Sequence, residues 1–133
     1  MVITVEKRAN WTPDINGNLD LPESEQVSFS YDKPLAYKRS EWKKIVATRK
    51  KDGSLETYVD TDRARVIRDS NVKIVNLVMD EDGKSRQIST GEELLNARSA
   101  VCSFFVDALV AQILREDYRD ELKNSESASG PSS

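Results

Sequence analysis

The chain has 133 residues, of which 38% are hydrophobic and 32% charged, and its formal net charge is −3. This composition is typical of one charge-rich folded domain with a modest core and excludes a chain that is disordered throughout. The absence of histidine and the single cysteine, Cys102, exclude Ser-His-Asp and Cys-His catalysis, Cys/His metal clusters and an internal disulfide. We therefore expect a protein that is not an enzyme and that needs no cofactor or metal.

The N-terminal part of the chain is predicted to contain two strands that pair with each other. Val2–Val5 is dominated by β-branched residues, which favour extended structure. Residues 26–31 alternate polar and apolar side chains, which is the pattern of a strand with one buried face. The side chains expected to point inward are Val27, Phe29 and Tyr31.

Residues 10–22 are predicted to form an ordered loop, because two prolines and an Asn-Gly pair punctuate them. We expect Trp11 and Leu19 to hold this loop against the body of the protein. Several side chains with oxygen atoms also have the spacing of the ligands in a calcium-binding loop. They are Asp14, Asn16, Asn18 and Asp20, with Glu25 at the twelfth position. Leu19 occupies the sixth position, where such a loop needs glycine, so a plain turn is the favoured interpretation.

A helix is predicted over residues 36–50, where apolar and long side chains share one face at helical spacing. These side chains are Trp42, Ile45, Val46 and Arg49. The same region holds a basic cluster, which consists of Lys38, Arg39, Lys43, Lys44, Arg49, Lys50 and Lys51. Seven cations against one carboxylate, Glu41, give residues 38–51 a local charge of +6 and leave −9 on the rest of the chain. Such a helix could bind nucleic-acid phosphates, but the negative overall charge favours an ordinary solvated face.

A second helix is predicted after Thr61 and Asp62, which can cap its start. Its apolar stripe consists of Ala64, Ile67, Asn71, Ile74 and Val78. Residues 72–79 also fit a strand, so the sequence leaves helix and strand open over residues 66–79. The remaining short elements are a turn at 52–53, an extended segment at 55–59, a turn at 80–83 and an extended segment at 86–88.

One long helix is predicted from Ser89 to Leu122, because a Ser-Thr pair precedes two glutamates at the spacing of a capping box. Its central stretch, Ala100–Leu114, is apolar on nearly all sides and therefore needs cover from another part of the chain or from another molecule. Cys102 is expected to be buried there, and Asp107 to meet a partner group or a water-facing edge. The predicted partner-binding residues are Val101, Phe104, Phe105, Leu109 and Ile113. The alternative is that all five belong to the core.

The predicted fold class is α+β, with a small N-terminal antiparallel sheet, about three helices and a long C-terminal apolar helix. Residues 1–123 are expected to form a single domain. Residues 124–133 are rich in serine and polar residues and are expected to form a flexible, disordered tail. The N-terminus has no signal-peptide pattern, which indicates an intracellular protein.

Three stretches together carry a family resemblance. They are Trp11–Asn18 leading into Leu21–Val27, then Val72–Val78 closing on Asp82–Lys84, and then Ile88–Leu95, with an apolar helix and a polar tail after them. This order resembles small proteins of tailed bacteriophages and prophages that are encoded in the tail-assembly region, notably the tail assembly chaperones. The resemblance carries no specific site residue over to this chain.

The resemblance implies a non-enzymatic assembly factor in the host cytoplasm that binds the phage tape measure protein, or another tail protein, during tail morphogenesis. It also implies self-association and absence from the finished particle. Two alternatives stay open from the residues themselves. One is a virion structural subunit, such as a neck or tail connector, whose terminal arms become ordered on neighbouring subunits. The other is a nucleic-acid-binding regulator that uses a basic helix over residues 38–51.

Overall fold

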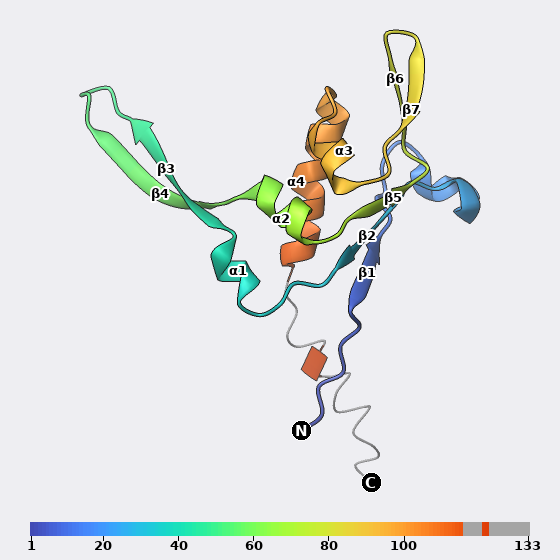
Figure 1. Cartoon of the computed structure of the whole chain (residues 1–133), viewed down its shortest axis with the longest axis horizontal. Coiled ribbons are helices and arrows are strands. Elements are labelled where there is room, and N and C mark those ends of the chain that lie inside the picture. Colours follow the sequence, from blue (N-terminus) through green and yellow to red (C-terminus); the bar gives the residue numbers. More distant parts are fainter. Residues whose placement is uncertain (116–120, 123–133) are drawn as a thin grey trace.

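The structure of the chain, a computed structural model, describes residues 1–115 and 121–122. It is an α+β fold in which a three-stranded antiparallel sheet packs with helices and two hairpins project from the body (Figure 1). The strands are β1 (Arg8–Trp11), β2 (Ser28–Asp32), β3 (Lys43–Arg49), β4 (Leu55–Thr61), β5 (Lys73–Val75), β6 (Val78–Glu81) and β7 (Lys84–Gln87). The helices are α1 (Lys38–Glu41), α2 (Arg63–Asp69), α3 (Gly91–Leu95) and α4 (Ala100–Leu114), with 3-10 turns at η1 (Asn18–Asp20) and η2 (Glu23–Glu25).

The three-stranded sheet has the order β1-β2-β5, so β2 lies in the middle. Its centre is apolar on one face: Phe29 and Tyr31 of β2 are buried, and Val27 just before the strand packs against the core. This outcome confirms the predicted strand and its inward side chains. Phe29 lies opposite Ile74 of β5, and its ring lies 5.2 Å from that of Phe105 on α4. The core therefore forms where the sheet meets α4.

The prediction that Val2–Val5 pairs with this strand is wrong. The pairing strand is β1, which begins at Arg8, and Arg8 lies opposite Asp32, the last residue of β2. Because β2 has ended there, residues before Arg8 have no strand opposite them, and Val2–Val5 stays exposed without strand structure.

The loop between β1 and β2 is ordered, as predicted, but its anchor is different. Trp11 packs against Phe29, with ring centroids 5.2 Å apart, whereas Leu19 is half-exposed. Asn18 is buried instead, and its amide bonds backbone groups of Pro13 and Val27. The polar side chain of Asn18 therefore anchors the loop in place of the predicted apolar side chain of Leu19.

The single long helix predicted from Ser89 to Leu122 is divided in the structure. Thr90 caps α3 by accepting from Glu93 N–H, as the sequence indicated, but α3 ends at Leu95. Ser99 then caps a new helix, α4, whose last residue is Leu114. Residues 121–122 are again helical, whereas the predicted tail at 124–133 lies outside the described residues. Cys102 is buried, as predicted.

Two further helix predictions are corrected. The predicted helix over residues 36–50 is helical only in α1 and then becomes β3, where the β-branched pair Ile45-Val46 favours a strand. The helix that Asp62 caps ends at Asp69, and the chain continues into β5 and β6. The open region 66–79 is therefore helical up to Asp69 and extended in β5 and from Val78 onward. The predicted extended segments at 55–59 and 86–88 fall in or beside β4 and β7.

Candidate functional site

The hairpin of β3 and β4, residues 43–61, projects from the body, and we name it the arm (Figure 1). Its two strands pair in full register from Lys43 opposite Thr61 to Arg49 opposite Leu55. Each strand packs chiefly on the other, and nearly all of their side chains are exposed. A two-stranded hairpin with no cover is marginally stable in water, so an arm of this kind is expected to meet another molecule.

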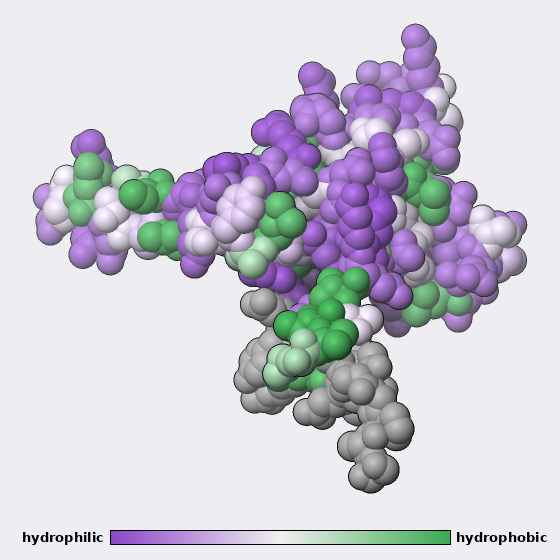
Figure 2. All heavy atoms as spheres, turned by 60° about the horizontal axis from the view of Figure 1, so that its bottom comes forward, coloured by the Kyte–Doolittle hydropathy of each residue, from purple (hydrophilic) through white to green (hydrophobic). Residues whose placement is uncertain are grey.

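The register divides the arm into two faces, because side chains alternate along a strand. One face, which we name the apolar arm face, consists of Lys43, Ile45, Ala47, Arg49, Leu55, Thr57, Val59 and Thr61. Ile45 is 78% exposed and lies directly opposite Val59, which is 62% exposed. The face has cations at both ends and no carboxylate. Figure 2 shows hydrophobic side chains gathered on the arm.

The opposite face of the arm is more polar and carries both signs of charge. It consists of Lys44, Val46, Thr48, Glu56, Tyr58 and Asp60. Within the described residues, the sheet contains only β3 and β4, so the outer edge of each strand is unpaired. An open edge and an exposed apolar face are two features by which hairpins bind other proteins.

The base of the arm is fixed to α2 by buried and paired groups. Trp42, immediately before β3, is 2% exposed, and its indole N–H donates to the Asp69 carboxylate at 2.8 Å. The backbone N–H of Asp62, immediately after β4, donates to the Trp42 carbonyl at 2.6 Å. The Asp62 side chain then caps α2 by accepting from Arg65 N–H. The arm is therefore held where it leaves the body, although its outer part is uncovered.

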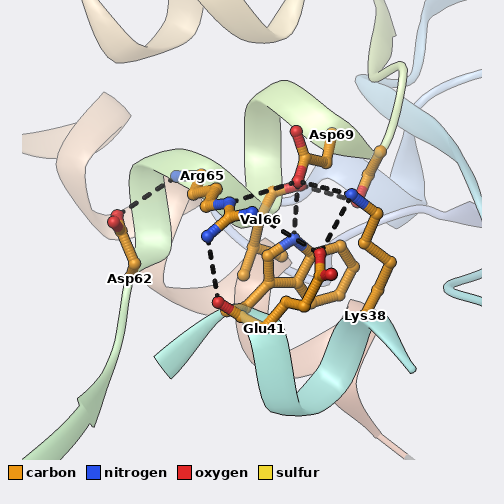
Figure 3. A network of polar contacts seen from close by, with 8 residues as sticks. Lys38, Glu41, Asp62, Arg65, Val66 and Asp69 are labelled. Carbon is orange, nitrogen blue, oxygen red and sulfur yellow. Dashed lines mark hydrogen bonds and ion pairs between the residues drawn. The ribbon is translucent and has the colours of Figure 1, made fainter. Parts of the chain in front are cut away.

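Asp69 is the centre of the charged network at this base, where Lys38 and Arg65 reach it from different sides (Figure 3). Lys38 Nζ lies 3.5 Å and Arg65 Nε 3.6 Å from Asp69 Oδ2. The pKa of the Asp69 carboxyl lies below its ordinary value, first because the Trp42 indole donates to it and then because of the two cations, with burial acting in the opposite direction. Glu41 pairs with the same two cations.

Three of the five predicted partner-binding residues belong to the core. Phe105, Leu109 and Ile113 are each at most 4% exposed, so a partner cannot reach them, and their assignment to an interface is corrected. The reason is that one side of α4 packs on the sheet and α2, which the sequence alone could not place.

Val101 and Phe104 stay on the surface, 51% and 50% exposed. The Asp107 carboxylate lies about one turn beyond Phe104, and its side chain is 64% exposed. It forms an ion pair with Arg63, whose Nε lies 3.1 Å from Asp107 Oδ1. Of the two roles predicted for this aspartate, the water-facing edge is the one observed. We name Val101, Phe104 and Asp107 the α4 stripe.

The basic cluster does not lie along one helix. Lys38 pairs at the base of the arm, and Arg39 donates to the Leu114 carbonyl at 2.8 Å. The other five cations lie on the two faces and the tip of the arm, because they belong to β3 and the turn after it. The sequence interpretation missed the exposed apolar residues Ile45, Leu55 and Val59. Two seven-residue segments rich in β-branched residues on either side of Asp-Gly were the signal for them.

The described residues contain no group of three or more His, Cys, Asp and Glu side chains placed to hold a metal ion. In the loop that echoes a calcium site, Asn18 faces inward, where its amide is occupied by backbone groups. In the same described ranges, no helix has the length and hydrophobicity needed to cross a bilayer. The chain matches no protein-family model, no curated protein and no solved structure.

Proposed function

We propose that this chain is a non-enzymatic assembly protein that acts by binding other proteins. The arm is the observation that carries this proposal: it is fixed at its base by Trp42 and exposes Ile45 and Val59 to solvent. Apolar side chains that are exposed to this degree have an unfavourable free energy in water, which a partner reduces by covering them. The lack of histidine, the commonest general base, also favours binding over catalysis.

In its specific form, the proposal is a tail assembly chaperone that binds the tape measure protein during phage tail morphogenesis. The support is the resemblance of the stretches from Trp11 to Leu95 to that family. The surfaces offered to such a partner are the apolar arm face and the α4 stripe. A helix-rich partner can lay an apolar side on either surface, which is a common mode of peptide recognition.

The test is affinity purification of the tagged chain from phage-producing cells, with mass spectrometry of the captured proteins and of purified particles. We expect one long, helix-rich tail protein to be captured and the chain itself to be missing from the particles. Capture of no phage protein would reject the proposal.

A second candidate is a structural subunit of the neck or tail. The fixed base of the arm favours it, because an arm held by Asp62 and Asp69 is presented in one direction to a permanent neighbour. The same purification separates the two candidates, since a structural subunit is present in particles in stoichiometric amount with its neighbours.

The hypothesis of a nucleic-acid-binding regulator no longer has the structural feature that it required. It required a basic helix over residues 38–51, and most of this segment is the strand β3 and a turn. We therefore do not propose it.

A further inference from the structure

We propose that the open edge of β3 binds an extended, acidic segment of a partner protein as an added strand. The inference rests on the proposed function, because it names the way in which the arm of an assembly protein holds its partner. Extended segments bind open sheet edges through backbone hydrogen bonds, and the side chains of the edge strand give the binding its specificity. The register of the arm and the charges of its two strands carry the inference.

The direction of the backbone groups at this edge follows from the register. In an antiparallel pair, residues that exchange hydrogen bonds alternate with residues that do not. At the base of the arm, the Asp62 N–H donates to the Trp42 carbonyl. At the tip, the Lys50 N–H donates to the Ser54 carbonyl. Since residues 42 and 50 take part in these bonds, the even-numbered residues between them face β4. The odd-numbered residues of β3 turn their N–H and C=O groups away from β4, and they are Lys43, Ile45, Ala47 and Arg49.

These outward groups form a row in which donors and acceptors alternate. Within the described part of the chain, the sheet contains only β3 and β4, so no strand lies against this row. Another extended backbone offers both donors and acceptors and matches the row in full. Nucleic-acid phosphates accept hydrogen bonds but donate none, so they do not match the carbonyl groups. The edge therefore favours a protein segment.

The two strands of the arm carry opposite charges. β3 has three cations and no carboxylate, whereas β4 has two carboxylates and no cation. The β4 carboxylates already have partners, since Glu56 lies 3.9 Å from Lys50, and Asp60 lies 3.8 Å from Arg63. Among the residues that the structure describes, no carboxylate forms an ion pair with the cations of β3, which are Lys43, Lys44 and Arg49. The edge of β3 therefore favours an acidic segment.

The same chemistry disfavours a second copy of the chain at this edge. Two β3 edges would bring cations against cations, and like charges that face each other destabilise a strand pair. If β4 of a second copy paired with β3 instead, its outward residues would face Lys43 and Arg49. These residues carry no charge, and they are Leu55, Thr57, Val59 and Thr61. The two cations would then stay without partners, so a different protein is the expected occupant.

The positions of the three cations define the segment. In the antiparallel arrangement, which is the more stable one for each residue, the segment begins opposite Arg49. The residues opposite Lys44 and Lys43 come five and six positions later. Acidic residues at these positions would each face a cation, whereas the residues between them face Ile45 and Val46 and their neighbours. The expected segment therefore has a β-branched, apolar centre with one acidic residue before it and two after it.

The variant Ala47→Pro removes an outward N–H from β3 and no bond to β4, which is the position where an edge strand tolerates proline. Thr57→Pro is the matched control, because Thr57 lies directly opposite Ala47 and its N–H points outward at the edge of β4. Arg49→Glu reverses an exposed charge at the β3 edge and introduces no proline, so it decides the test if Ala47→Pro does not fold. Circular dichroism with thermal unfolding shows which variants fold.

The probe is the fluorescein-labelled peptide Glu-Thr-Val-Thr-Val-Glu-Glu, which has the seven residues of β3, and fluorescence anisotropy measures its binding. We expect the wild type and Thr57→Pro to bind it alike, and Ala47→Pro and Arg49→Glu to bind it at least about tenfold more weakly. A peptide with lysine in place of the three glutamates should bind the wild type at least about tenfold more weakly. Hydrogen exchange of the Ala47 amide should slow when the acidic peptide binds, and that of the Thr57 amide should not.

Four results would each overturn the inference. They are no binding of the acidic peptide, equal binding of the acidic and lysine peptides, unchanged binding by folded Ala47→Pro or Arg49→Glu, and tighter binding of a short DNA duplex than of the acidic peptide. The first three would show that this edge does not add an acidic strand, and the last would assign the cations to nucleic acid.

The outcome is separable from that of the proposed function. A wild-type chain that captures a long tail protein from cells but binds no acidic peptide would reject the added strand and leave the assembly function standing. Peptide binding at the β3 edge without any captured phage protein would support the added strand and reject the function.

Discussion

Asn18 holds the loop between β1 and β2 through its side-chain amide. The amide N–H groups donate to the Pro13 and Val27 carbonyls at 2.9 and 3.0 Å, and the amide oxygen accepts from Val27 N–H at 2.8 Å. Asn18 is 6% exposed, so little water can replace these bonds. One polar side chain thus satisfies three backbone groups in a segment without regular pairing.

We expect Asn18→Ala to lower the free energy of unfolding by about 2–3 kcal/mol, because it leaves these backbone groups without partners. Urea unfolding followed by tryptophan fluorescence measures the change. The control is Asn16→Gly, since Asn16 has a φ of 48° and glycine tolerates that conformation at least as well. A loss for Asn18→Ala no larger than that of the control would contradict this account of the loop.

Asp69 gives the base of the arm a predictable dependence on pH. Its carboxylate accepts from the Trp42 indole at 2.8 Å, and its pKa lies below the ordinary value. A carboxyl whose folded pKa is lowered adds stability above its unfolded pKa and loses it as the pH falls through the folded pKa. The contribution is therefore complete at neutral pH and disappears in acid.

We expect the free energy of unfolding to fall with acidification and Asp69→Asn to flatten part of this slope, because asparagine has no proton to gain. Its amide oxygen can still accept from the indole, so the fluorescence of Trp42, measured in a Trp11→Phe background, should stay close to that of the parent at neutral pH. Equal acid slopes for the two proteins would show that Asp69 does not set the pH response.

At the scale of elements, the sequence correctly predicted whether a segment is helix or strand where one face of the element was clearly buried. The alternation that places Phe29 and Tyr31 inward identified β2, and Thr90 and Asp62 marked two true helix starts. The prediction failed over β3, where Trp42, Ile45 and Val46 fit helical spacing by chance. Of these three residues, only Trp42 faces the core. Ile45 and Val46 lie in a hairpin that is stabilised by contacts between side chains on its two strands.

Only part of the candidate site could be predicted from the sequence, because spacing along a helix does not show which side will be buried. Phe104 and Phe105 are adjacent in the sequence and equally apolar, yet one is half-exposed and the other is in the core. A helix that is apolar on nearly all sides gives no sign of which side will be covered. Tertiary packing decides this, and it assigns three of the five predicted residues to the core.

The break between α3 and α4 makes Ser99 the cap of an independent helix. Its hydroxyl accepts from the N–H groups of Val101 and Cys102 at 3.2 and 3.4 Å. We expect Ser99→Ala to lower the free energy of unfolding by about 1 kcal/mol, as is typical of a lost N-cap. Chemical denaturation measures the loss, and Ser103→Ala, an exposed position inside α4, serves as the control. Equal effects at the two positions would mean that Ser99 is not an effective cap.

At the scale of the whole molecule, the arm and the core are separate in their packing. The core residues come from β2, β5, α2, α3 and α4 and from Val72 and Ile88 between these elements, with Trp42 at the base of the arm, and no residue of β3 or β4 is among them. Lys43 and Thr61 lie opposite each other, so a short turn can join them when the rest of the arm is removed. The structure thus predicts that the arm contributes little to folding.

We expect excision of residues 44–60, with a two-residue Asn-Gly connection in their place, to leave the free energy of unfolding within about 1 kcal/mol of that of the full chain. The anchoring contacts of Trp42 with Asp62 and Asp69 lie outside the excised segment. Thermal and urea unfolding measure the difference. A core that does not fold without the arm would show that the hairpin is a structural element.

The most direct test of the arm's role compares the full chain and the arm-excised chain as baits in phage-producing cells, with captured proteins quantified by mass spectrometry. We propose the arm as the surface by which this protein binds others, so the full chain should capture the proposed phage partner and the folded, arm-excised chain should not. Capture of the same partner in the same amount by both baits would show that the arm is not the binding surface.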